Sequence, residues 1–413
     1  MSKDVIHSST SDFLRRLTDL TSLVADSDSL RRLEILLADF LACSLGAINT
    51  KPTFDSTLSL DGIIGKSAWL ALNVNQNDQD DIDWTVGTHP GSIIWSTALA
   101  VTLINEESRD HFIKAALAGY RTLASVATFF GAEHRGKWHV TATAGAFASA
   151  TTAAILLNLS TEQHFQALHL VGANMGGSVL APRDRSGAAG FNRSAATALG
   201  VTSVMAVQAG AQHVSDPWDG PVGVCELFEI ARDLKSAERL PDGVSTTSLR
   251  LFPVTGFAQA AVLAAANLSA RNSWDLHRLD VGVSGVAIPY LDGTRGGDWW
   301  DVRSAVASAW RSKNPTILAT ANELKRMVHV SAIDIPMGGA RIIASTDKGE
   351  DREIILSAPG GDFNDRDEVR WRTTKWSRLV GARVESMREV STNLVMGNNA
   401  PQIWQQLGQF LKK

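Results

Sequence analysis

Apolar residues in the first 210 positions recur at the spacing of amphipathic helices. Residues 30–47 carry an apolar stripe on one helical face, and Gly46 stands near its end as a stop signal. The stripe consists of Leu30, Leu33, Leu37, Phe40, Leu41 and Ser44. Comparable patterns predict helices over residues 62–72, 93–104, 112–130, 141–157, 160–170 and 195–210.

The stretch 131–172 is the one around which the chain is organised. Its segment 141–157 is dense in Ala, Gly, Ser and Thr, and side chains this small let helix axes approach closely. We therefore expect a central helix here, followed by a helix that begins with a capping box at Ser160 and Gln163. His139 precedes the small-residue segment. It is either a reactive group at the floor of an active site or a structural histidine in front of a buried helix.

The pattern changes after residue 247. Leu279, Val281 and Val283 alternate with polar residues, as strand residues do, and residues 328–332 repeat this alternation. Residues 340–346 and 352–358 flank a Lys-Gly turn and predict a hairpin. With helices predicted over residues 302–310 and 317–327, this part reads as a compact α+β module.

Helical patterning returns from residue 371 to the end. The simplest architecture is mainly α. A large all-helical domain comprises residues 1–247, with residues 375–413 returning to it, and a smaller α+β lid domain of residues 248–374 is inserted between them.

The amino-acid composition indicates which kinds of binding partner and which cellular compartment to expect. The 413 residues are 44% hydrophobic and 20% charged, as in ordinary globular proteins, and the net charge of −4 includes no basic run that would suit nucleic acid or an anionic membrane. Cys43 and Cys225 form neither a disulfide framework nor a zinc pattern, which fits a reducing compartment. The sequence has no signal peptide and no apolar run of about 18 residues, so a cytoplasmic protein is expected.

Standard catalytic signatures are absent. The chain has no phosphate-binding loop, paired-histidine zinc motif, nucleophile elbow or dinucleotide fingerprint. Any catalysis would therefore rest on side-chain acids, bases and arginines, without a metal or an organic cofactor.

Two loops offer such side chains. Residues 81–91 place Asp81, Asp83, Thr85 and His89 ahead of a predicted helix, and histidine is the side chain best suited to proton transfer near neutral pH. The loop either orients a reactive histidine or merely uses its Asp and Thr side chains in turns and caps. A second loop, residues 183–193, carries three arginines that either bind carboxylates or lie in solvent.

Several segments, in order, resemble motifs of the MmgE/PrpD family, which contains 2-methylcitrate dehydratase, cis-aconitate decarboxylase and iminodisuccinate epimerase. They include LLADFLACSLGA, DIDWTVGTHPG, AALAGY, the stretch from RGKWHVTATAG to NLSTEQ, GANMGG, LKRMVHVSAID and a later KW. The resemblance implies a helical domain with an α+β lid, usually as a homodimer, and a cofactor-free site between the two. The implied chemistry removes a proton or CO2 beside a carboxylate.

The resemblance assigns catalytic positions to Asp81, Thr85, His89 and His139. Other positions depart from the family. No lysine stands at residues 189–193, where the resemblance expects a catalytic one.

The cations nearest to that missing lysine are Arg193 and Arg185. Arg250 and Thr255 replace a Lys and a His that the family carries at the start of the lid. Gln259 replaces a second His, and Ser304 or a neighbour replaces the lid tyrosine. Arginine anchors carboxylates but rarely transfers protons, so these changes favour an altered substrate or reaction, or lost activity.

These observations lead to one main hypothesis and two alternatives. The main hypothesis is a lyase that dehydrates or decarboxylates a small organic acid and serves a specialised biosynthetic pathway. His139 and His89 would act as acid and base with Asp81 and Thr85 orienting them. The substrate would be held by Arg193, Arg185, Arg250 and Thr255. The alternatives are an isomerase, epimerase or cyclase on the same scaffold, and an inactive homologue that only binds ligands or partners.

Overall fold

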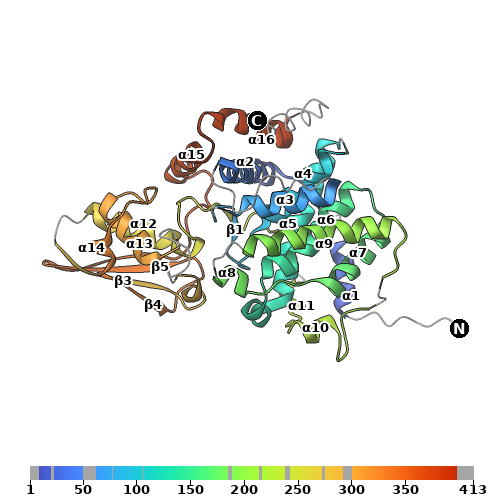
Figure 1. The fold of residues 1–413 in the computed structure, drawn as a ribbon, viewed down its shortest axis with the longest axis horizontal. Coiled ribbons are helices and arrows are strands. Elements are labelled where there is room, and N and C mark those ends of the chain that lie inside the picture. Colours follow the sequence, from blue (N-terminus) through green and yellow to red (C-terminus); the bar gives the residue numbers. More distant parts are fainter. Residues whose placement is uncertain are drawn as a thin grey trace.

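The computed structural model describes residues 9–19, 23–49, 62–76, 78–105, 107–184, 188–213, 216–237, 242–271, 275–291 and 300–397. Within these ranges the fold is mainly α, as expected. Figure 1 shows a bundle of helices beside a smaller part that contains the β-sheet, with the red C-terminal helices lying over the blue helix α2.

The helical part confirms every helix expected before residue 210. Its long helices are α1 (Ser9–Leu17), α2 (Ser27–Asn49), α3 (Gly62–Val74), α4 (Pro90–Thr102), α5 (Arg109–Lys137), α6 (Val140–Leu156), α7 (Thr161–Asn174) and α9 (Ala188–Gln208). Short helices α8 (Leu180–Asp184), α10 (Val224–Leu227) and α11 (Leu234–Ala237) accompany them. α4 starts three residues earlier than predicted because Pro90, whose φ suits a first helical turn, opens it.

Helix α6 lies at the centre of the bundle and packs against α4, α5, α7 and α9. All of its residues are buried, which confirms that the small-residue segment is central. Close approach explains the composition: a Cβ built on Gly200 of α9 would lie 2.6 Å from Cβ of Ser149. The Ser160–Gln163 capping box at the start of α7 is also confirmed.

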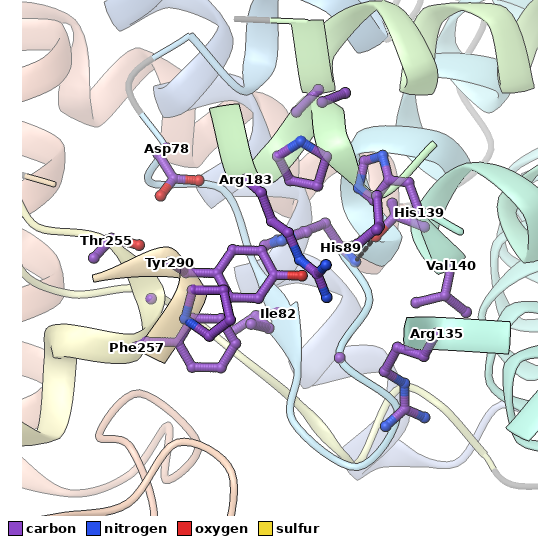
Figure 2. A pocket seen from close by; sticks show the side chains of 18 of the residues that line it. Asp78, Ile82, His89, Arg135, His139, Val140, Arg183, Thr255, Phe257 and Tyr290 are labelled. Carbon is purple, nitrogen blue, oxygen red and sulfur yellow. Dashed lines mark hydrogen bonds between the residues drawn. The ribbon is translucent and has the colours of Figure 1, made fainter. Parts of the chain in front are cut away.

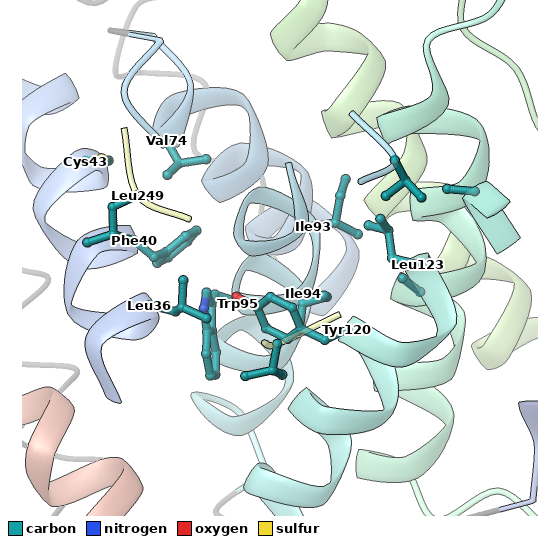
Figure 3. Packing of buried hydrophobic residues seen from close by; sticks show 14 of the residues in the cluster. Leu36, Phe40, Cys43, Val74, Ile93, Ile94, Trp95, Tyr120, Leu123 and Leu249 are labelled. Atoms are coloured by element: carbon teal, nitrogen blue, oxygen red, sulfur yellow. The ribbon is translucent and has the colours of Figure 1, made fainter. Parts of the chain in front are cut away.

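The core of the bundle extends from α6 to α2. Figure 3 shows Leu36 and Phe40 of α2 beside Trp95 of α4, and the ring centroid of Trp95 lies 6.0 Å from that of Tyr120. These side chains are buried, so α2 and α4 share one continuous apolar core.

The second part is a four-stranded sheet with strand order β4-β3-β5-β6. Its strands are β3 (Leu276–Ser284), β4 (Val328–Ile333), β5 (Ala340–Thr346) and β6 (Gly349–Ile355). β3 pairs with β4 in parallel and with β5 antiparallel, and β5 and β6 form the predicted hairpin. Helices α12 (Gln259–Arg271) and α13 (Val302–Ser312) pack against the strands and against each other.

The prediction of a helix over residues 317–327 is wrong for most of that range, because only α14 (Asn322–Lys325) is helical. Ile317 and Leu318 are exposed, so this segment has no apolar face to bury. The hydroxyl of Ser308 instead donates to the carbonyl of Ile317 and accepts from the Ala319 N–H, which holds the segment in a non-helical course.

After the sheet, the chain returns to the helical part through α15 (Arg366–Val380) and α16 (Val384–Met396), joined by the short 3-10 helix η3 (Gly381–Arg383). α15 and α16 both pack against α2. The helix expected in the closing residues 403–413 lies outside the described residues. Among the residues that the structure describes, no helix is both long enough and apolar enough to cross a membrane.

A two-stranded antiparallel pair connects the two parts of the fold. β1 (Ile82–Asp83) lies in the loop before α4, and β2 (Thr247–Ser248) lies where the chain leaves the helical part. This pairing fixes the loop of residues 78–89, which carries the candidate site residues Asp81, Thr85 and His89, against the segment that leads into α12.

Candidate active site

A cavity of about 770 Å³ opens between the helical part and the sheet-containing part. Its lining includes His89, His139, Arg193, Arg250 and Thr255, five of the eight predicted site residues. Figure 2 shows the two histidines side by side at this cavity, with Thr255 across from them. Of the other three, Asp81 and Thr85 are outside the lining, and Arg185 is outside the described residues.

His89 is the N-cap residue of α4, where Pro90 fixes the first helical turn. Its Nδ1 lies 2.7 Å from the carbonyl oxygen of Asp81, and a carbonyl can only accept a hydrogen bond. The proton of the neutral ring is therefore on Nδ1, and Nε2 carries a lone pair. Burial, with the nearby positive charges of Arg193 and Arg250, holds the pKa of His89 well below its ordinary value of 6.5.

His139 is the N-cap residue of α6, and its backbone N–H donates to the carbonyl of Gly177. Its Nδ1 lies 3.2 Å from Nδ2 of Asn192, and that amide nitrogen also lies 3.0 Å from the carbonyl oxygen of Ser178. The carbonyl fixes Nδ2 as a donor, so Nδ1 of His139 accepts and the ring proton is on Nε2. Burial, followed by the charge of Arg193, lowers the pKa of His139 to about 3.

The two neutral histidines therefore have opposite tautomers in one cavity. His89 has an unprotonated Nε2, which can accept a proton, while His139 has an Nε2–H, which can donate a hydrogen bond. The backbone N–H of His89 donates to the hydroxyl of Thr141 at 3.3 Å, which ties the start of α4 to the start of α6. A base and a hydrogen-bond donor fixed in this way suit proton transfer at a bound molecule.

Asp81 positions His89 rather than touching the cavity. Its buried carboxylate accepts the backbone N–H of Gly91, 3.0 Å from each oxygen, and the hydroxyl of Tyr120 at 3.3 Å. A Cβ at position 91 would lie 2.7 Å from an Asp81 oxygen, which explains the glycine. Burial and the neighbouring Asp80 carboxylate raise the pKa of Asp81 to about 8.

The raised pKa of Asp81 makes a prediction about stability. Unfolded Asp81 releases its proton near the ordinary pKa of 3.8, whereas the folded state keeps it up to about pH 8. The stability that Asp81 contributes is thus fully present below about pH 4 and is lost as pH rises through about 8. Asp81→Asn removes this loss, so the free energy of unfolding of the variant relative to the wild type should rise between pH 5 and 8.

Chemical denaturation at several pH values measures this difference. Asp347→Asn, in the exposed turn between β5 and β6, is the matched control and should keep a constant offset from the wild type. An offset for Asp81→Asn that also stays constant with pH would contradict the raised pKa.

Thr85 and Asp83 stabilise the turn before α4. Thr85 is exposed, and its N–H and hydroxyl both donate to Oδ1 of Asp83, at 2.9 and 2.6 Å. The other oxygen of Asp83 accepts the hydroxyl of Thr246 at 2.8 Å. For these two residues the structure places the side chains in turn-forming bonds, away from the cavity lining.

Arg193 and Arg250 were expected to hold substrate carboxylates, but their guanidinium groups bind the protein's own carboxylates. Nη1 of Arg193 lies 2.7 Å from Asp80, and Nη1 of Arg250 lies 2.5 Å from Asp78. Nη2 of Arg250 binds Asp80 as well, and its Nε donates to the backbone oxygen of Asp80 at 2.5 Å. The four charged groups are buried and mutually paired, although both arginines also line the cavity. That these arginines hold substrate carboxylates therefore stays a prediction.

Asp78 and Asp80 are site residues that the sequence reasoning missed. Both residues lie in the acidic segment NDQDDID, whose density of carboxylates could have indicated them. The prediction instead named Asp81 and Asp83, which are closer to His89 in the sequence. Asp78 and Asp80 lie in the loop between α3 and β1, and Asn75 donates to Asp80 at 2.8 Å. Arg193 and Asp80 both influence the pKa of His139, so this ion cluster controls the charge beside the histidines.

The structure also describes Thr255, Gln259 and Ser304, the three remaining positions that the sequence singled out. Thr255 is buried, stands at the N-cap position of the 3-10 helix η1 (Gly256–Ala258) without a capping side-chain bond, and lines the cavity. Gln259 is fully buried and bonds to both backbone groups of Phe252, so it holds a turn. The hydroxyl of Ser304 donates to Asp301 at 2.9 Å at the start of α13.

The described residues contain no cluster of three or more His, Cys, Asp or Glu side chains that could hold a metal ion.

Comparison with known families matches one part of the chain. The model of the MmgE/PrpD N-terminal domain matches residues 68–237, a range that contains Asp80, His89, His139 and Arg193. This match supports membership of the MmgE/PrpD family. No curated protein matches the chain. Because MmgE/PrpD proteins include dehydratases and decarboxylases, membership supports an enzyme of the dehydratase-like lyase type.

Proposed function

We propose that this protein is a cofactor-independent lyase of the MmgE/PrpD type that acts beside a carboxylate of a small organic acid. It either removes a proton from carbon, followed by loss of water, or removes CO2, followed by protonation of the same carbon. The observation that carries the proposal is the pair of opposite histidine tautomers, His89 and His139, at one cavity. One ring offers a lone pair and the other an N–H, which is what a carbon acid needs for deprotonation.

For a dehydration, Nε2 of His89 takes the proton from the carbon beside a carboxylate. The electrons of that C–H bond first form an enediolate with the carboxylate. The enediolate then collapses to the C=C double bond as the C–O bond to a β-hydroxyl breaks, and the His89 imidazolium protonates the leaving hydroxyl to give water. The Nε2–H of His139 donates to the enediolate oxygen and keeps its proton. Arg193 helps to keep both rings neutral, since its charge lowers the pKa of both histidines.

Asp81 serves this chemistry indirectly. Its carbonyl accepts the Nδ1–H of His89, and its carboxylate holds the first turn of α4 through Gly91. Thr85 has no part in the proposed proton transfer, because its hydroxyl is used by Asp83. The lowered pKa values of both histidines keep them neutral from pH 6 to 9, and a bound carboxylate would raise the basicity of His89.

Turnover of a panel of hydroxy acids and unsaturated acids in deuterated water tests the proposal. We expect a product that has lost water or CO2, solvent deuterium at the reacting carbon of recovered substrate, and a pH–rate profile without an inflection near 6.5. Deuterium incorporation with no loss of mass would identify an isomerase instead. The absence of both turnover and exchange across the panel would favour a protein that only binds its ligand.

Several expectations stay predictions at this stage. They are the division into a helical domain and an inserted lid at residues 248–374, the homodimer, a cytoplasmic location and a role in a specialised biosynthetic pathway. Light scattering of the purified protein would test the dimer directly.

A further inference from the structure

The charges at the cavity fall into two groups. Arg193 and Arg250 form the inner group, and their guanidinium groups are paired with Asp78 and Asp80, as described above. Because two arginines face two carboxylates, this group has no net charge left for several substrate carboxylates. Arg193 keeps one unsatisfied donor, its buried Nε–H, close to the histidines.

The outer group consists of Arg135, near the end of α5, and Arg183 in α8. Both line the cavity, and neither forms an ion pair with a carboxylate in the part of the chain that the structure describes. The Nε–H of each is buried and lacks an acceptor there. Nη2 of Arg183 makes a long hydrogen bond, 3.3 Å, to the carbonyl of Gly136, which brings α8 and the end of α5 together.

The carboxylate that acts on the pKa of Arg135 is Asp83, and both oxygens of Asp83 are already bonded to threonine hydroxyls. Arg135 and Arg183 are therefore the cations at this cavity that the described protein groups leave available to an anion. A guanidinium with open N–H groups is a strong carboxylate ligand.

The wall contributed by the sheet-containing part is aromatic and apolar. Phe257 follows Gly256 in η1, and Tyr290 ends the 3-10 helix η2 (Ile288–Tyr290); their ring centroids lie 5.1 Å apart. Figure 2 shows these two rings together, with the Arg183 guanidinium beside Tyr290; its central carbon lies 5.8 Å from the ring centroid. Further apolar lining comes from Trp138, Val286, Trp300 and Met337.

We infer that the cavity binds an amphipathic organic acid. Its carboxylate lies between Arg135 and Arg183, and its apolar body, aromatic or alkyl, packs against Phe257, Tyr290 and Trp138. A compact tricarboxylate fits poorly, because the inner arginines are already neutralised and the wall offers it no polar partners. This inference rests on the proposed function, for which it names the substrate class.

Calorimetric titration of the full chain tests the inference with three probes. 4-Phenylbutanoate has one carboxylate and an aromatic body, 4-phenylbutanamide has the same body without charge, and tricarballylate has three carboxylates without an apolar body. We expect phenylbutanoate to bind about tenfold more tightly than either of the other two, because it alone satisfies both the arginines and the aromatic wall.

Variants distinguish the contacts to the carboxylate of the ligand from the contacts to its apolar body. Arg135→Gln and Arg183→Gln should each weaken binding of phenylbutanoate about tenfold and leave that of the amide unchanged. Phe257→Ala should weaken both, and Arg352→Gln, on the exposed edge strand β6, should change neither. Asp78→Asn should improve the binding of tricarballylate, because it frees part of the Arg250 guanidinium.

Tighter binding of tricarballylate, no binding of phenylbutanoate, or arginine variants without effect would each overturn the inference. The outcome is distinguishable from failure of the proposed function. If the probes bind as expected but no acid exchanges deuterium, only the proposed chemistry fails. If tricarboxylates are turned over while amphipathic acids do not bind, only the substrate class fails.

Discussion

Replacing His139 with alanine is expected to lower turnover about 10²- to 10³-fold while the protein stays folded. His139 supplies the Nε2–H that the proposed enediolate oxygen accepts, and Asn192 holds that tautomer. No second histidine can take this place, because Nδ1 of His89 is bonded to the Asp81 carbonyl. Steady-state rates with the best substrate of the panel, together with melting temperatures, measure the effect.

Two further variants make this result specific. His277→Ala removes an exposed histidine of β3 and should leave the rate unchanged. His139→Gln restores a side-chain N–H donor in nearly the same place and should recover part of the lost rate. Near-normal turnover by a folded His139→Ala protein would contradict the assignment of His139.

Replacing Lys375 with methionine is expected to lower the free energy of unfolding by about 3–5 kcal/mol. Lys375 of α15 is fully buried, and its Nζ donates to both oxygens of Asp39 in α2, at 2.6 and 2.8 Å. Without the lysine, Asp39 is a buried carboxylate left with the Nε1–H of Trp376 and the thiol of Cys43. Urea denaturation of the variant and the wild type measures the loss.

The loop of residues 78–89 is expected to become more mobile in this variant as well. Lys375 also donates to the carbonyl of Gln79 at 2.7 Å, and Gln79 lies between Asp78 and Asp80. The double variant Asp39→Leu/Lys375→Met removes both charges and should recover at least half of the lost stability. Arg271→Met breaks the partly exposed pair with Glu353 and should have a much smaller effect. A loss below about 1 kcal/mol for Lys375→Met would contradict a structural role for this buried pair.

The sequence predicted the fold well where a pattern reflects burial on one face. α2, α6 and the strands β3 to β5 follow this rule, because their apolar or small residues recur with the period of the element. The prediction for residues 317–327 was wrong because Ile317 and Leu318 are apolar but exposed, held by bonds to Ser308 that no local pattern reveals.

The site was predictable only in part. His89 and His139 stand out because each precedes a buried helix, and the structure places both at one cavity. The pairing of Arg250 with Asp78 joins residues 172 positions apart, so local sequence reasoning had no means of finding it. The tautomers depend in the same way on distant partners, such as Asn192 for His139. Arg135 and Tyr290 belong to separate elements that only the folded chain brings to the same cavity.

The most direct test of the account is a ¹⁵N NMR measurement of the imidazole nitrogens in protein labelled at histidine, with signals assigned by His89→Gln and His139→Gln. This measurement needs no knowledge of the substrate. The account predicts that both rings are neutral from pH 6 to 8, with the proton of His89 on Nδ1 and that of His139 on Nε2. An imidazolium at either position in this range, or the same tautomer at both, would contradict it.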